Sequence, residues 1–202
     1  GVSERYLEQI PELERITHRV TKDKPHILDK LQAIFNFVVN KFTYQYPVPQ
    51  RGVKYIFANN FSGDCGEYSS LFVAMCRIVK IPAINRTGYI ILPKQRKVIE
   101  HGWASVYLSP LGWVDVDTQY AALEKNSKIA FNKFFCQRSD YRFVTTNGFN
   151  ISLKPKISSR LNTDYWRKHS FPMVNGTVQT LQPIFFAITK KVRFEDHISL
   201  ER

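Results

Sequence analysis

The sequence predicts a single α+β domain in which helices come first and an antiparallel sheet follows. Apolar residues recur at helical spacing up to about residue 80, and β-branched and aromatic residues dominate the segments that follow. Two Asn-Gly dipeptides, at residues 147–148 and 175–176, each lie between alternating segments, which is a strong signal for a β-hairpin. The 202 residues suffice to bury a sizeable core without disulfide or metal support.

Two helices are expected before residue 43. Residues 3–20 are charged and favour a helix, which Pro11 is expected to split or kink because proline removes an internal helical hydrogen bond. Pro25 suits the first position of a second helix. The apolar residues that follow it share one helical face: Ile27, Leu31, Ile34, Phe35, Val38 and Phe42.

The next helix is expected to begin at Asp64. Residues 43–50 contain two prolines and are expected to form an extended loop, and residues 51–63 are expected to be irregular. From Asp64 an apolar helical face returns, and the Ile81-Pro82 dipeptide closes the helix. The members of this face are Tyr68, Leu71, Phe72, Met75 and Val79.

Strands are expected from residue 83 onward. Residues 83–92 are rich in β-branched and aromatic side chains, and residues 98–108 alternate as a second strand. A turn at residues 109–112 leads to a third strand at residues 113–117. The two Asn-Gly dipeptides then predict that the C-terminal third is mostly antiparallel strand.

The net charge of +12 does not define a function. Residues 1–67 carry nine basic and eight acidic side chains, residues 68–134 nine and four, and residues 135–202 eleven and five. The excess is thus scattered, and its short clusters lack interleaved aromatic residues, so we expect no nucleic-acid partner. The apolar stretches are too short to cross a bilayer. Because the chain starts at Gly1, we favour an extracytoplasmic location after leader removal over a cytoplasmic one.

Cys65 is the candidate nucleophile among three cysteines. An odd count without CxxC or Cys/His ligand spacing predicts neither a disulfide framework nor a metal site, and we expect no cofactor. Cys65 lies at a loop–helix junction between two glycines. There, backbone N–H groups and the helix dipole favour a thiolate with a lowered pKa, and the same N–H groups can donate to an oxyanion. Cys76 and Cys136 are expected to be packing residues.

A base and an orienting acid are available on the predicted strands. His101 lies within the second strand and Asp117 at the end of the third, so a hairpin can place them on neighbouring strands. The acid would accept from one imidazole nitrogen while the other faces Cys65, which is the arrangement of a catalytic triad. Asp115 has the same parity along its strand as Asp117 and is the alternative acid.

Three sequence blocks resemble the transglutaminase-like superfamily, in its microbial form. Residues 63–68 (GDCGEY), followed by RIVKIP and TGY, resemble its nucleophile segment. Residues 101–107 (HGWASVY) resemble its His strand and residues 112–118 (GWVDVDT) its Asp strand. The blocks occur in the family's order, with the cysteine, histidine and aspartate 36 and then 16 residues apart. The resemblance covers roughly residues 28–153.

The resemblance implies a papain-like fold, with the nucleophile helix packed on an antiparallel sheet, and a triad of Cys65, His101 and Asp117. It favours Asp117 over Asp115 because the family's acid stands just before a threonine position. Two features depart from the family pattern: the proline that often follows the acid is absent, and no run of acids resembles a calcium loop.

The oxyanion site also departs from the animal enzymes of the family. Those enzymes carry a tryptophan upstream of the cysteine, whereas all three tryptophans of this chain lie downstream of it. Tyr44 and Gln45, on the upstream loop, are candidate donors. The Gly66 backbone is a further candidate for contact with the oxyanion or the substrate.

The resemblance also implies an organisation and an activity. We expect a helical extension at residues 1–24, a catalytic core at residues 25–153, and a β-rich extension of the same domain at residues 154–202. The expected activity is thiol-dependent acyl transfer at amide bonds of peptide or protein substrates, foremost that of a cysteine protease or amidase. The alternatives are a protein-glutamine transglutaminase or deamidase, and a non-catalytic protein-binding module. The oligomeric state is left open.

Overall fold

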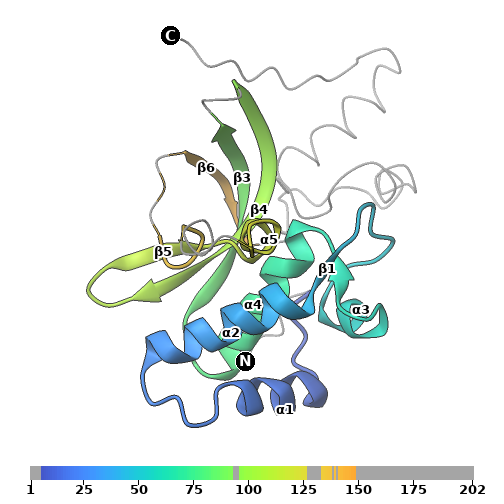
Figure 1. The fold of residues 1–202 in the computed structure, drawn as a ribbon, viewed down its shortest axis with the longest axis vertical. Helices are drawn as coiled ribbons and strands as arrows, with labels where there is room; N and C mark the ends of the chain where they lie inside the picture. Colours follow the sequence, from blue (N-terminus) through green and yellow to red (C-terminus); the bar gives the residue numbers. More distant parts are fainter. Residues whose placement is uncertain (1–5, 93–95, 127–132, 138, 140, 149–202) are drawn as a thin grey trace, which may run out of the picture. The chain divides into compact units, whose positions relative to one another are not determined.

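The structure, a computed structural model, describes residues 6–92, 96–126, 133–137, 139 and 141–148. Contacts along the chain divide it into two compact units, residues 1–85 with 102–139 and residues 86–101 with 140–202. The boundaries between the units fall inside two strands (Figure 1). The predicted extension at residues 154–202 and the hairpin at residues 175–176 lie outside the described residues.

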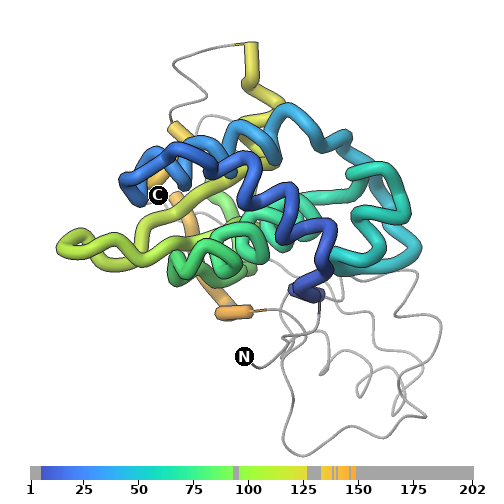
Figure 2. The backbone as a smooth tube through the Cα atoms, turned by 90° about the horizontal axis from the view of Figure 1, so that it is seen from below, coloured from blue at the N-terminus to red at the C-terminus, as the bar shows by residue number. Residues whose placement is uncertain are grey.

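Helix α4 is the central helix of the first unit. It packs against all four other helices of the described chain, as Figures 1 and 2 show. Every residue of α4 from Cys65 to Cys76 is buried. The helices are α1 (Pro11–Val20), α2 (Ile27–Lys41), α3 (Val53–Ala58), α4 (Cys65–Ile78) and α5 (Thr118–Leu123).

The prolines of the N-terminal region precede or begin helices. Pro11 is the first residue of α1, where its missing N–H costs no hydrogen bond, so it starts the helix and does not kink one. Helix α2 begins two residues after Pro25, at Ile27, with His26 as N-cap. Ile27 is 55% exposed because the first turn of α2 projects into solvent, whereas the rest of the predicted face is buried.

Three short elements, two strands and a helix, occupy the region between α2 and α4. Strand β1 (Thr43–Tyr44) pairs in parallel with β2 (Ser62–Gly63), inside segments expected to be loops. Helix α3 lies in the segment expected to be irregular. Its six residues span fewer than two turns, too few for an apolar period to stand out. The β1–β2 pair places Tyr44 beside Gly63, two residues before Cys65.

The main sheet follows the helices, as predicted. It comprises β3 (Ala83–Leu92), β4 (Lys97–Leu108), β5 (Gly112–Val116) and β6 (Arg142–Asn147), in the order β5-β4-β3-β6. In the first unit, β4 and β5 form an antiparallel hairpin from Ala104–Val116 to Leu108–Gly112. In the second unit, β3 pairs with β6 in antiparallel fashion.

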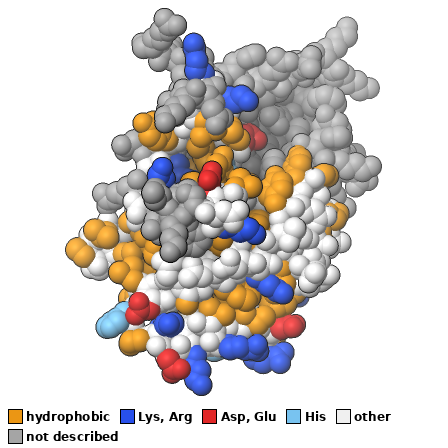
Figure 3. Space-filling view, in the orientation of Figure 1, with side chains coloured by type: hydrophobic (Ala, Val, Ile, Leu, Met, Phe, Trp, Pro, Cys, Tyr) orange, Lys and Arg blue, Asp and Glu red, His pale blue; other side chains and the backbone are white. Residues whose placement is uncertain are grey.

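The core of the first unit joins its helices to the β4–β5 hairpin. One buried cluster contains Phe35 of α2, Phe72 of α4, Val106 of β4 and Val114 of β5. The α+β fold, with the nucleophile helix packed on an antiparallel sheet, is therefore confirmed. On the face seen in Figure 3, acidic and basic side chains are interspersed over the helical part of the molecule.

Candidate active site

Cys65 is the first residue of α4 and lies inside a capping box. The preceding Asp64 is the N-cap, and its Oδ1 accepts a hydrogen bond from the Gly66 backbone N–H at 2.9 Å. Three residues after the cap, the Glu67 carboxylate accepts from the backbone N–H of Asp64. The helix therefore starts where the sequence predicts, and the thiol stands between two capping carboxylates.

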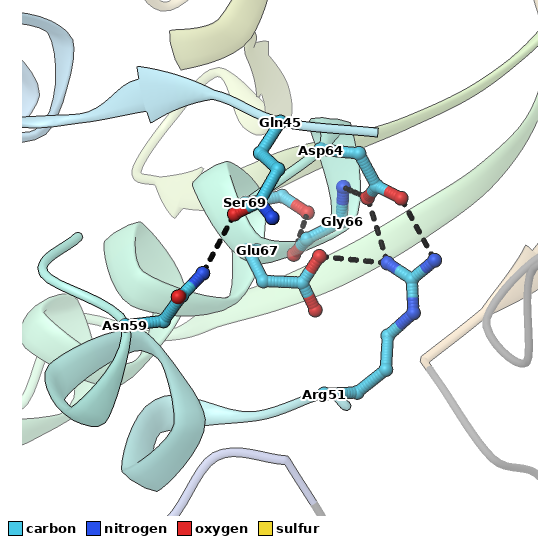
Figure 4. Close-up of polar contacts among 7 residues, drawn as sticks. All are labelled: Gln45, Arg51, Asn59, Asp64, Gly66, Glu67 and Ser69. Atoms are coloured by element: carbon cyan, nitrogen blue, oxygen red, sulfur yellow. Dashed lines mark hydrogen bonds and ion pairs between the residues drawn. The ribbon is translucent and has the colours of Figure 1, made fainter. Parts of the chain in front are cut away.

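A buried arginine binds both of these carboxylates (Figure 4). Arg51 Nη1 and Nη2 each lie 2.7 Å from an Asp64 oxygen, which is a bidentate pair. Nη1 is also 2.7 Å from Glu67 Oε2. The side chains of Asp64 and Glu67 are fully buried and that of Arg51 nearly so. Sequence reasoning missed this cluster, although the Asp-x-x-Glu spacing of a capping box signals part of it.

The first unit also brings Gly102 and Asp117 to Cys65. The thiol sulfur has a hydrogen bond with the Gly102 backbone, and the charge of Asp117 is near enough to act on the thiol. Asp117 is 1% exposed and caps α5, since its Oδ1 accepts from the Tyr120 backbone N–H at 3.0 Å. Asp117 therefore begins a helix instead of ending a strand as predicted.

His101 directly precedes Gly102 in β4. Its side chain is buried, with 4% of its surface exposed. His101 is the last residue of the first segment of the second unit, whereas Gly102 and Cys65 belong to the first unit. The pairing of His101 with Cys65 therefore stays a prediction.

The alternative acid, Asp115, has different neighbours. Its Oδ1 accepts from Ser105 Oγ at 2.6 Å, across the β4–β5 hairpin, and its backbone pairs with that of Gln137. Asp117, and not Asp115, is among the charges that shift the pKa of Cys65. This difference supports the choice of Asp117.

The pKa of Cys65 is raised, which is opposite to the expectation from the helix N-terminus. Burial is the largest cause because it disfavours the thiolate, and the Asp64 carboxylate adds to it, with a smaller contribution from Asp117. The Gly102 backbone hydrogen bond and the Arg51 cation act in the opposite direction. The sequence could not reveal this balance because it depends on residues brought together by folding.

The three oxyanion candidates occupy different environments. The Tyr44 side chain is 51% exposed, and its pKa is raised by partial burial and then by the neighbouring Cys65. Gln45 Oε1 accepts from Asn59 Nδ2 at 2.7 Å and from Ser62 Oγ at 2.8 Å. The N–H of Gly66 is already bonded to Asp64.

The other two cysteines are packing residues, as predicted. Cys76 is fully buried in the core, and burial raises its pKa well above the ordinary value. Cys136 packs against the same core, and burial raises its pKa to about 12. All three cysteines are free thiols.

Within the described ranges, no group of three or more His, Cys, Asp or Glu side chains could hold a metal ion. No helix of the described chain is long and apolar enough to span a membrane. A hollow of about 610 Å³ lies at the other end of α4, is lined by several lysines, and contains none of the candidate residues.

Comparison with known families agrees with the geometry. The model of the transglutaminase-like superfamily matches residues 14–118, a range that includes Cys65, His101 and Asp117. The chain belongs to the transglutaminase-like superfamily. No curated protein sequence matches it.

Solved structures resemble this superfamily member in fold. One is a "Putative Cysteine Protease from Cytophaga hutchinsonii", with 16% identity and a TM-score of 0.52, covering 71% of this chain and 45% of its own. Another is the periplasmic domain of TgpA from Pseudomonas aeruginosa, with 20% identity and a TM-score of 0.48, covering 63% of this chain and 50% of its own. This chain thus spans about half the length of these proteins.

Proposed function

We propose that this protein is a thiol enzyme that hydrolyses amide bonds of peptides or proteins through a thioester on Cys65. The observation that carries the proposal is the position of Cys65. It begins a buried helix, lies inside a capping box, and has a hydrogen bond with the residue that follows His101. Membership of a superfamily with related cysteine and histidine segments supports it.

The raised pKa of Cys65 indicates how the thiol is activated. A neutral thiol predominates at neutral pH, so attack on the carbonyl carbon requires a base that accepts the thiol proton as the S–C bond forms. We assign this base to His101. Asp117 holds the imidazole and stabilises the imidazolium that results.

The tetrahedral intermediate places negative charge on the former carbonyl oxygen. Tyr44 is the side-chain donor that we assign to this oxygen, because it is the candidate whose hydroxyl lies within electrostatic range of Cys65. Gln45 is instead held by Asn59 and Ser62, which fix its amide and the path of β1.

Collapse of the intermediate completes the cycle. The C–N bond breaks, and the departing amine takes the proton from His101, which leaves a thioester on Cys65. His101 then removes a proton from water, whose oxygen attacks the thioester carbonyl. The carboxylic acid leaves and the thiol regains its proton. An amine in place of water gives the transglutaminase alternative.

A comparison of two cysteine variants tests the proposal. Cys65→Ala is expected to lower amide hydrolysis by about 10³-fold or more, whereas Cys76→Ala, on the same helix, retains it. Hydrolysis of a peptide library is followed with and without an added amine, and mass spectrometry locates the trapped acyl group. Hydrolysis that survives Cys65→Ala contradicts the thiol mechanism. A folded protein that neither acylates Cys65 nor cleaves any peptide supports the binding-module alternative.

The organisation and location of the protein are also part of this proposal. We place the catalytic core at residues 25–153, between extensions at residues 1–24 and 154–202, and the protein outside the cytoplasm. The family match at residues 14–118 lies mostly inside this core. Limited proteolysis and fractionation of source cells test these two statements.

A further inference from the structure

The cluster formed by Arg51, Asp64 and Glu67 is notable for its burial. Three ionisable side chains meet at distances of 2.7 Å, and all three are almost completely removed from solvent. Removing charges from water is unfavourable, and an apolar set of side chains of similar volume is often as stable. Stability alone is therefore a weak reason for an arginine at this place.

The position of the cluster along the chain suggests a second role. Asp64 and Glu67, both labelled in Figure 4, are the two members of the capping box. Cys65 is the first residue between them along the chain. Arg51 comes from the loop that follows β1 and precedes α3. Its guanidinium therefore joins that loop to the turn of α4 that carries the thiol.

The charges of the cluster act on the thiol in opposite directions. The Asp64 carboxylate disfavours the Cys65 thiolate, and the Arg51 cation favours it. Without Arg51, the Asp64 carboxylate would remain beside the thiol with no cation bound to it. The bidentate contact also fixes where the Asp64 carboxylate lies, because the planar guanidinium binds both of its oxygens at once.

We propose that Arg51 is a positioning residue for the Cys65 nucleophile. By binding both side chains of the capping box, it holds the first turn of α4 and offsets the negative charge of Asp64 beside the thiol. This inference rests on the proposed function, since it concerns the reactivity of the same thiol. Arg51 acts on Cys65 through its neighbours and is not assigned a contact with the substrate.

The rate of Cys65 alkylation tests the proposal without any substrate. Iodoacetamide labelling is followed by mass spectrometry of the Cys65 peptide from about pH 7 to pH 10. Arg51→Gln is expected to lower the rate about tenfold at each pH, as a shift of about one pKa unit requires. Arg51→Lys retains the charge but loses the bidentate contact, and is expected to lie between wild type and Arg51→Gln.

Arg77→Lys is the matched control, because Arg77 lies at the opposite end of the same helix and donates to a backbone carbonyl. Its alkylation profile is expected to coincide with that of wild type. A merely structural role of Arg51 would lower stability yet leave the profile of the folded protein unchanged. Coincident profiles for folded Arg51→Lys and wild type would overturn the proposal. If Arg51→Gln does not fold, the alkylation profile of folded Arg51→Lys still tests the proposal.

The outcome separates this inference from the proposed function. A shifted profile together with absent amide hydrolysis contradicts the hydrolase and supports the role of Arg51. Amide hydrolysis that depends on Cys65, together with an unshifted profile, supports the hydrolase and contradicts the role of Arg51.

Discussion

The two ends of α4 are held by different kinds of interaction. At the N-terminal end, side chains do the capping: two buried carboxylates bind backbone N–H groups and share one arginine. At the C-terminal end, backbone N–H groups cap the helix. Ile81 N–H bonds to Cys76 C=O at 2.9 Å, and Lys80 N–H bonds to Arg77 C=O at 3.0 Å. This pair of hydrogen bonds defines a Schellman motif.

The two cysteines of α4 show what this difference means for reactivity. Burial raises the pKa of both thiols. Around Cys65, however, a cation and a backbone hydrogen bond oppose the effect of burial, whereas the second influence on Cys76 is another thiol, Cys136, which raises its pKa further. A helix N-terminus alone therefore does not make a thiol reactive. The charged and hydrogen-bonding groups around the thiol determine its reactivity.

The largest loss of stability is expected from removing Arg51 from its cluster with Asp64 and Glu67. Arg51→Met leaves the buried Asp64 carboxylate without its cation, so the free energy of unfolding is expected to fall by about 3–5 kcal/mol. Arg77→Met, at the other end of α4, removes a hydrogen bond to the Ala83 carbonyl and is expected to cost about 1 kcal/mol. Urea unfolding followed by circular dichroism measures both. Equal losses at the two ends would contradict the comparison.

Glu67 is expected to make the free energy of unfolding depend on pH, with a change per pH unit smaller than the loss in Arg51→Met. Burial is the main cause that raises its pKa to about 8, while Arg51 opposes this and Asp64 adds to it. The Glu67 charge in turn adds to the burial that raises the pKa of Tyr55. Between the ordinary carboxyl pKa and about 8, the native state holds a proton that the unfolded chain has lost. The free energy of unfolding therefore falls as pH rises, by up to about 1.4 kcal/mol per pH unit.

Glu67→Gln should remove this slope, because an amide does not titrate. Unfolding by urea between about pH 5 and pH 8 measures it. Glu12→Gln, at an exposed position of α1, is the matched control and should keep the wild-type slope. A slope that persists in Glu67→Gln would show that another group holds the proton.

The sequence predicts the elements around the N-terminal end of α4, but not the ion cluster at that end or the pKa of Cys65. Local sequence patterns predict the N-terminus of α4 next to Asp64, the strand at residues 83–92 and the candidate nucleophile Cys65. Arg51 escaped prediction because its partners lie 13 and 16 residues away and meet it only in the folded chain. The pKa of Cys65 depends on burial by several elements, which no local pattern reveals.

Asp117 shows the same limit at a second helix. The sequence places it at the end of the third strand, whereas that strand ends at Val116 and Asp117 is the N-cap of α5. That helix has six residues, from Thr118 to Leu123, and so few residues give no apolar period to recognise. Short helices next to functional residues are thus where pattern reasoning is weakest in this chain.

The smallest effect is expected at the C-terminal end of α4, and its sign is opposite to the others. Lys80 adopts a left-handed backbone conformation, with φ of 61°, at the position where glycine is preferred in a Schellman motif. A side chain there costs about 1 kcal/mol relative to glycine. Lys80→Gly is therefore expected to raise the free energy of unfolding by about 0.5–1 kcal/mol, since Lys80 is exposed and its side chain is not part of the core.

The matched substitution at the other end is Gly63→Ala, just before Asp64. A Cβ added to Gly63 would lie 2.5 Å from the Cβ of Glu67, so this change is expected to destabilise the protein by displacing the capping box. Urea unfolding of the two variants at one pH gives the contrast directly. A stabilising Gly63→Ala would show that the side-chain cluster does not limit packing at the N-terminal end of α4. A destabilising Lys80→Gly would show that the left-handed backbone at residue 80 is not a cost to stability. The two changes in the free energy of unfolding are expected to have opposite signs. At the C-terminal end of α4, glycine relieves an unfavourable backbone conformation, whereas at the N-terminal end the residues around Cys65 leave no room for a larger side chain.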